Sequence, residues 1–135
     1  MSCKTLLILV AAVLALARAK TYDRCEFARE IQTYGVPADQ VAVWTCIAQH
    51  ESEYNTAAVN WSSGDHGIYQ ISELYWCSTS GTPGGGCNAL CSQFEDDNIQ
   101  DDTACAQLIY GQMGFPAWTT YQYCNGDVSQ YTAGC

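Results

Sequence analysis

The hydrophobic pattern divides the chain into a short apolar leader and one larger segment of mixed polarity. Residues 6–17 form an unbroken apolar run that follows Lys4, and Ala17-Arg18-Ala19 has the small-x-small pattern of a signal-peptidase site. An N-terminal membrane anchor is the alternative, but the run is too short to span a bilayer as a helix. We therefore predict a signal peptide at residues 1–19, and a secreted, extracellular domain at 20–135.

Helical periodicity dominates the segment after the leader. Phe27 and Ile31 lie four residues apart, and Gly35 marks a C-terminal stop for their helix. Val41, Trp44 and Ala48 form a second stripe with helical spacing, so Trp44 is a predicted core residue. These patterns predict helices at 23–34, from 37 to about 50, and at 103–110.

Alternation of apolar and polar residues is confined to the middle of the chain. Ile68-Tyr69-Gln70-Ile71 is typical of a short strand, and residues 78–88 are rich in Gly, Ser and Thr, which predicts a loop. Short turns and aromatic residues fill the last 25 positions. Helices that flank a small strand region predict the α+β class.

Cysteine usage indicates an oxidising compartment. Of nine cysteines, Cys3 lies in the leader and eight remain. An even number in a small secreted chain predicts four disulfides, although eight cysteines allow 105 pairings and the sequence does not choose among them. A zinc site is the alternative. It is disfavoured because His50 and His66 are the only histidines and no C-x-x-C pair occurs.

The charge of the predicted domain is strongly negative. Lys20, Arg24 and Arg29 are its only basic residues beside 14 acidic ones, which gives a net charge of −11. Such a surface disfavours nucleic acid and anionic membranes as partners.

Two acidic residues stand in contrasting local settings. Val43, Ile47 and Glu51 lie at i, i+4 and i+8, so Glu51 falls at the end of an apolar helix face. Burial there disfavours the charged form of its carboxyl group. Asp65 follows Ser62, Ser63 and Gly64, a polar turn in which we expect it to stay ionised. Taken singly, the two are a helix-end surface acid and a turn acid. Glycoside hydrolysis needs one protonated and one ionised carboxyl group, and the pair becomes a candidate for it together with the cysteine pattern described next.

Several stretches resemble the family of c-type lysozymes and α-lactalbumins. The stretches that carry the resemblance are Cys46-x4-Glu51-Ser52, Asp65-His66-Gly67-Ile68-Tyr69-Gln70-Ile71, Tyr75-Trp76-Cys77, Cys87-x3-Cys91-x13-Cys105 and Ala117-Trp118, followed by Cys124 and Cys135. The resemblance covers residues 20–135 and implies a helical lobe, a small antiparallel β lobe and a cleft between them. It also implies the disulfides Cys25–Cys135, Cys46–Cys124, Cys77–Cys91 and Cys87–Cys105.

The resemblance further implies the residues of an active site. Glu51 would be the catalytic acid and Asp65 the second carboxylate, with substrate-binding residues Gln70, Ser72, Tyr75, Trp76, Ala117 and Trp118. Two departures from the family affect Asp65, because Ser72 replaces a longer amide side chain and the preceding turn is shorter. We therefore expect Asp65 to be less constrained and the enzyme to be slower. Tyr75 stands where tryptophan is usual, which predicts a weaker sugar contact.

The most acidic stretch of the chain resembles the calcium elbow of α-lactalbumins and calcium-binding c-type lysozymes. Asp96, Asp101 and Asp102 match the side-chain ligands, and Gln93 and Asn98 match the backbone-carbonyl ligands. Oxygen ligands of this kind suit Ca²⁺. The alternative is that Asp101 and Asp102 cap a helix while the other acids are solvated. We expect a structural Ca²⁺, with no cofactor for catalysis.

The function implied by the resemblance is that of a monomeric muramidase, digestive or antibacterial, which cleaves bacterial peptidoglycan with retention of configuration. A catalytically silent, lactalbumin-like binding or modifier protein is the alternative, but silent relatives usually lose one or both acids. The negative charge resembles that of acidic digestive lysozymes, and we expect better activity in mild acid than at neutral pH. A disulfide-rich toxin or inhibitor would not require the acid pair.

Overall fold

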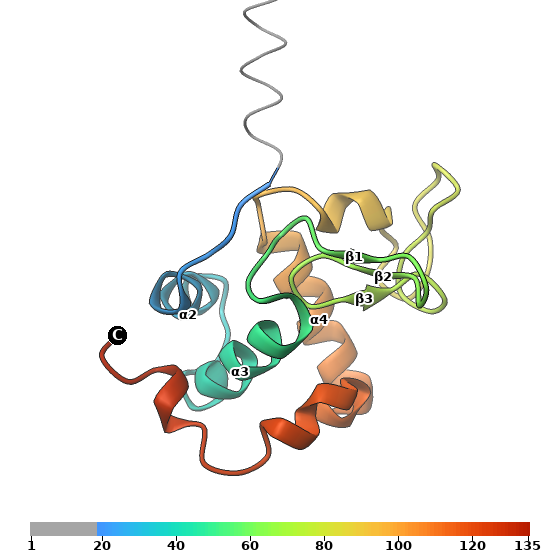
Figure 1. Cartoon of the computed structure of the whole chain (residues 1–135). Helices are drawn as coiled ribbons and strands as arrows, with labels where there is room; N and C mark the ends of the chain where they lie inside the picture. The colour runs from blue at the N-terminus through green and yellow to red at the C-terminus, as the bar shows by residue number, and fades with distance from the viewer. Residues whose placement is uncertain (1–18) are drawn as a thin grey trace, which may run out of the picture.

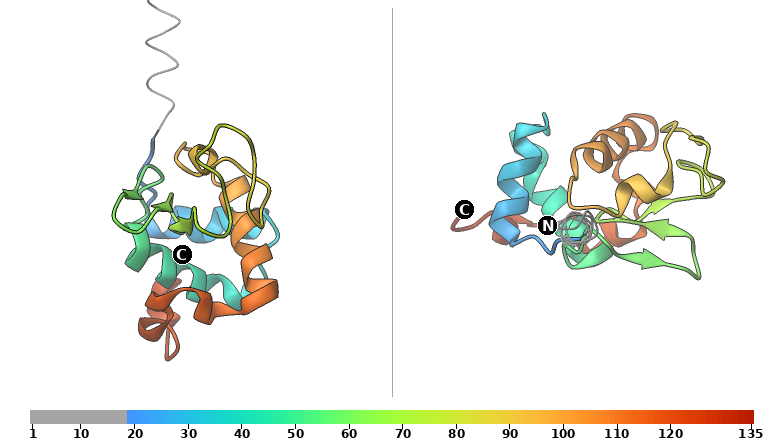
Figure 2. Two further views of the ribbon diagram at one scale, coloured as in Figure 1. Left: turned by 90° about the vertical axis from the view of Figure 1, so that its right-hand side faces the viewer. Right: turned by 90° about the horizontal axis from the view of Figure 1, so that it is seen from above.

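The computed structural model describes residues 19–135, so the predicted signal peptide lies outside the described residues except for Ala19. Three α-helices form the larger lobe: α2 (Arg24–Thr33), α3 (Val41–Ser52) and α4 (Gln100–Met113) (Figure 1). A small sheet and the loop after it lie on the side of the molecule away from α2 (Figure 2). The α+β class and the two-lobed architecture are therefore confirmed.

The helices follow the predicted periodicity, with differences at their ends. Asp23 accepts a hydrogen bond from the Cys25 N–H and forms a capping box with Glu26, so α2 begins at Arg24. The second predicted helix begins as a 3-10 turn, η1 (Ala38–Gln40), before α3. The third, α4, is longer than predicted at both ends.

The sheet corrects the predicted strand. It has three antiparallel two-residue strands in the order β1 (Val59–Asn60), β2 (Asp65–His66) and β3 (Ile71–Ser72). Residues 67–70 form the turn between β2 and β3, so a strand over 68–71 is wrong except at Ile71. Gly67 and Gln70 have φ of 80° and 53°, which breaks the extended backbone. Ile68 and Tyr69 are apolar because both are buried in the core.

The core lies between the helices and the inner side of the sheet. Trp44 is fully buried, as predicted, and its ring meets those of Tyr69, Phe115 and Trp118 edge to face. Because Tyr69 belongs to the β2–β3 turn, this aromatic cluster joins the two lobes. No helix among residues 19–135 is long and apolar enough to cross a membrane.

Four disulfides hold the remaining segments in place. They are Cys25–Cys135, Cys46–Cys124, Cys77–Cys91 and Cys87–Cys105, the pairing that the family resemblance implied. The first two fasten the C-terminal segment to α2 and α3. This segment contains the 3-10 helices η3 (Phe115–Ala117), η4 (Thr119–Tyr123) and η5 (Ser129–Tyr131). The other two close the loop that follows β3, which has little regular structure of its own.

Candidate active site

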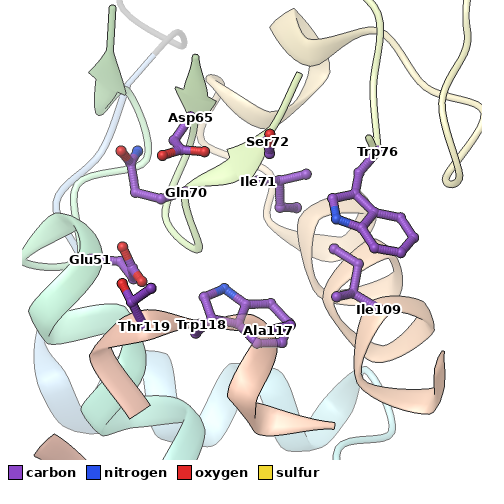
Figure 3. Close-up of a pocket in the computed structure, with 10 residues that line it drawn as sticks. All are labelled: Glu51, Asp65, Gln70, Ile71, Ser72, Trp76, Ile109, Ala117, Trp118 and Thr119. Carbon is purple, nitrogen blue, oxygen red and sulfur yellow. The ribbon is translucent and has the colours of Figure 1, made fainter. Parts of the chain in front are cut away.

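One cleft between the lobes collects most of the residues predicted to act on substrate. It is lined by Glu51, Asp65, Gln70, Ile71, Ser72, Trp76, Ile109, Ala117, Trp118 and Thr119 (Figure 3). Ile71, Ile109 and Thr119 were not predicted. Tyr75 was predicted but does not line the cleft, and it is 69 % exposed beside Trp76.

Glu51 enters the cleft from the last turn of α3. Burial raises the pKa of its carboxyl group, and the nearby charge of Asp65 acts in the same direction. The Thr120 hydroxyl donates a hydrogen bond to Glu51 Oε2 at 2.8 Å, which lowers the pKa and so opposes burial in part. Sequence reasoning missed Thr120, because nothing but its position two residues after Trp118 signals a contact with a helix 69 residues earlier.

Asp65 faces the same cleft from β2 (Figure 3). Its backbone pairs with Asn60 on one side and Ser72 on the other. The Ser63 hydroxyl donates to Asp65 Oδ2 at 2.7 Å, and among residues 19–135 no other side chain hydrogen-bonds this carboxylate. The Ser72 hydroxyl instead accepts a hydrogen bond from the Leu74 N–H. Asp65 therefore has one short hydroxyl partner from its own turn and no amide partner.

Gln70 and Trp118 are held by hydrogen bonds to the backbone. The Gln70 amide group donates to the carbonyl oxygens of Ala58 and Gly67, which ties the residue before β1 to the β2–β3 turn. The Trp118 indole N–H donates to the Tyr69 carbonyl oxygen at 2.9 Å. Trp118 is only 6 % exposed, so it forms a floor of the cleft more than an open stacking surface. Trp76 is partly exposed at the end of the cleft away from Glu51 and Gln70 (Figure 3).

A second cluster of acids lies outside the cleft, where α4 begins. Carboxylate oxygens of Asp96, Asp101 and Asp102 all lie within 4.8 Å of one another. Asp102 is fully buried, and neither of its carboxylate oxygens has a hydrogen-bond partner among residues 19–135. Burial raises its pKa well above the ordinary value, and the adjacent Asp101 adds to this. Unpaired buried carboxylate oxygens are costly, so these donors fit a hard cation such as Ca²⁺.

The two carbonyl positions predicted for that cation, Gln93 and Asn98, lie on either side of Asp96 in the sequence. Gln93 lies in η2 (Cys91–Phe94), and Asn98 lies in the loop two residues before α4. The Asn98 side chain accepts a hydrogen bond from the Gln100 N–H and so helps to begin the helix.

The cleft defines a class of chemistry. A half-buried carboxyl group with a raised pKa and a second carboxylate, held by a serine hydroxyl, face one cavity that is lined by two tryptophans. This arrangement suits acid-assisted cleavage of a glycosidic bond.

Comparison with known proteins leads to the same class. Residues 20–135 match the C-type lysozyme/alpha-lactalbumin family. The chain is 46 % identical to Lysozyme 2 of Lucilia sericata over 133 residues, which cover 90 % of this chain and 92 % of that protein. It is 43 % identical to Lysozyme B of Drosophila melanogaster, with 91 % and 93 % covered. It is 40 % identical to Lysozyme C-2 of Sus scrofa, with 98 % of each covered. The chain belongs to the C-type lysozyme/alpha-lactalbumin family.

Proposed function

We propose that this protein is a secreted lysozyme, a glycoside hydrolase that cleaves the β-1,4 bond between N-acetylmuramic acid and N-acetylglucosamine in bacterial peptidoglycan, with a digestive or antibacterial role. The observation that carries this proposal is the pair of Glu51 and Asp65 in one cleft, with the pKa of Glu51 raised by burial. Named lysozymes that align over most of the chain support it.

The proposed reaction divides two roles between the two carboxyl groups. Protonated Glu51 donates its proton to the glycosidic oxygen as the bond to the anomeric carbon breaks. Asp65 bonds to, or stabilises, the anomeric carbon as positive charge develops there. Ionised Glu51 then removes a proton from water, which attacks the same carbon and releases Asp65, so configuration is retained. These steps require no cofactor. The cleft residues Gln70, Ser72, Trp76, Ala117 and Trp118 would bind the sugar chain, and the exposed Tyr75 beside Trp76 would contact it outside the cleft.

Clearing of Gram-positive cell-wall suspensions tests this proposal. The Glu51→Gln variant keeps the size of the side chain but carries no acidic proton, so we expect roughly a thousandfold loss of rate. Glu53→Gln is a matched control, because Glu53 is exposed just beyond α3. Equal clearing by wild type and Glu51→Gln would contradict the proposed role of Glu51. If the wild type clears nothing at any pH, the silent, lactalbumin-like alternative takes its place.

We further propose that Asp96, Asp101 and Asp102, with the backbone carbonyls of Gln93 and Asn98, hold a structural Ca²⁺. The unpaired buried oxygens of Asp102 support this proposal. When bound, the ion would supply positive charge among three crowded carboxylates and tie the loop after η2 to α4. It lies outside the cleft and takes no part in the reaction.

Thermal unfolding with calcium and with a chelator tests the calcium site. Calcium at about a hundredfold its dissociation constant adds ~2.7 kcal/mol to the free energy of unfolding. We expect Asp102→Asn to remove this gain and to make the metal-free protein more stable, since one buried charge among like charges disappears. Asp97→Asn, at an exposed position, is the control and should keep the gain. A calcium effect that survives in Asp102→Asn would rule out these ligands.

The remaining parts of the proposal concern location and partners. We propose that residues 1–19 are a signal peptide and that the secreted domain acts as a monomer. The four disulfides and the family match over residues 20–135 support secretion. The net charge disfavours nucleic acid and anionic membranes as partners.

A further inference from the structure

The glycine-rich loop after β3 packs directly against a tryptophan of the cleft. At Gly86, an added Cβ atom would lie 2.5 Å from Cε3 and 2.7 Å from Cζ3 of the Trp76 ring. Both distances are far below van der Waals contact, so the backbone of Gly86 lies directly against the Cε3–Cζ3 edge of the indole ring. Ile109 of α4 lies at the same end of the cleft (Figure 3).

The backbone conformation at Gly86 does not require glycine. Gly85 beside it has a φ of 72°, in the left-handed region, whereas Gly86 is not among the residues with positive φ. An alanine at 86 would therefore meet no backbone strain, and the contact with Trp76 is what excludes a side chain. Glycine is thus favoured at 85 by the left-handed backbone of the turn, and at 86 by the close contact with the Trp76 ring.

The loop behind the ring is firmly held. The Gly86 N–H donates to the Tyr75 carbonyl oxygen at 2.8 Å, and the Cys87 N–H donates to the Trp76 carbonyl oxygen at 3.0 Å. The Cys87–Cys105 disulfide then fastens this segment to α4. When an atom is added at 86, the indole ring is thus the part that moves.

We infer that Gly86 is a positioning residue for substrate, because its bare backbone supports the Trp76 ring at the orientation in which the cleft presents it to a sugar. The inference rests on the proposed function and adds a determinant of sugar binding outside the residues that line the cleft. Trp76 would stack on a pyranose ring, and stacking depends on ring orientation. A methyl group at 86 would rotate or push the indole and weaken that stacking, while Glu51 and Asp65 stay in place.

The test compares Gly86→Ala with Gly84→Ala. Gly84 lies in the same loop and is not among the residues with positive φ. An added Cβ there would meet the Ser78 side chain at 3.3 Å and the Thr82 carbonyl oxygen at 4.0 Å, and no aromatic ring is among its three nearest neighbours. The probes are the β-1,4-linked trimer of N-acetylglucosamine for binding and the hexamer for hydrolysis. We expect Gly86→Ala to raise the dissociation constant of the trimer and the KM of the hexamer roughly 3- to 10-fold, with kcat nearly unchanged. The indole N–H resonance of Trp76 should shift in Gly86→Ala and stay in place in Gly84→Ala.

A Trp76→Ala background shows whether Gly86 acts through the ring. There, Gly86→Ala should have no further effect on the dissociation constant, because the ring it would displace is gone. An unmoved Trp76 resonance with unchanged binding in Gly86→Ala would overturn the inference, as would an equal loss of binding with and without Trp76. A wild type that binds the trimer but fails to cleave the hexamer or cell walls would instead refute the proposed function. The dissociation constants of the trimer for the wild type and Gly86→Ala would then still test the role of Gly86.

Discussion

Glu51 and Asp65 face one cleft from two very different kinds of surroundings. Glu51 lies in the last turn of the 12-residue helix α3, one turn after Ile47 and Ala48, which are fully buried. Asp65 lies in a strand of only two residues, next to an exposed turn, and its carboxylate has one hydroxyl partner. The residue after it, His66, is buried and its Nε2 lies 2.7 Å from Glu73 Oε2, so polar contacts hold this strand on its other face.

The difference shows how one fold separates the properties of two chemically similar groups. On the helical side, apolar packing removes water from Glu51 and favours its protonated form. On the sheet side, strand pairing and the Ser63 hydroxyl fix the position of the half-buried Asp65. We therefore expect the pKa of Glu51 to change with its burial and hydrogen bonding. We expect the position of Asp65 to change with substitutions in the turn that contains Ser63.

Among substitutions that test this difference between Glu51 and Asp65, removal of the charge of Asp65 should lower activity most. Asp65→Asn keeps the shape of the side chain but stabilises positive charge at the anomeric carbon poorly, so we expect kcat to fall roughly 100- to 1,000-fold. Steady-state hydrolysis of the hexamer of N-acetylglucosamine measures this loss. Asp127→Asn, at an exposed position, is the control. A loss of less than about tenfold would show that Asp65 is not the second carboxylate of the reaction.

Loss of the one hydroxyl that holds Asp65 should have an intermediate effect. Ser63→Ala removes a hydrogen bond of about 1 kcal/mol, and we expect kcat to fall about fivefold with little change in thermal stability. Ser62→Ala is the matched control, since Ser62 is equally exposed and its hydroxyl makes no hydrogen bond among residues 19–135. Unchanged kcat in Ser63→Ala would mean that the strand alone is sufficient to position Asp65.

The smallest effect is expected from the hydroxyl that contacts Glu51, and it should appear in the pH profile. Activity requires protonated Glu51, so it falls as pH rises through the pKa of this group. Thr120 lowers that pKa, and Thr120→Val should therefore move the alkaline limb to higher pH. Thr120→Ser keeps the hydroxyl and should restore the original limb.

The same pH profile tests the expectation from net charge. We expect the wild type to be more active in mild acid than at neutral pH, which a peak above neutral would contradict. If the alkaline limb of the pH profile stays in place in Thr120→Val, the Thr120 hydroxyl does not lower the pKa of Glu51.

Local sequence and tertiary structure determine different features of this molecule. Periodicity was sufficient to predict α2, most of α3, and Glu51 at the end of an apolar helix face, because helical spacing is set within a few residues. The alternating pattern at residues 68–71 predicted a strand, which was wrong for residues 68–70. Ile68 and Tyr69 are apolar because the turn that holds them is buried, with Tyr69 against Trp44, and the positive φ at Gln70 has no clear sequence signal.

By itself, the sequence determined the helices, the even number of cysteines, the negative charge and the two acids. The tertiary structure decided what surrounds those acids. It brought Thr120 to Glu51, left Tyr75 outside the cleft and laid Gly86 against Trp76. The physical reason is that these contacts join segments held by disulfides and core packing, and neither periodicity nor residue type encodes the distance between such segments.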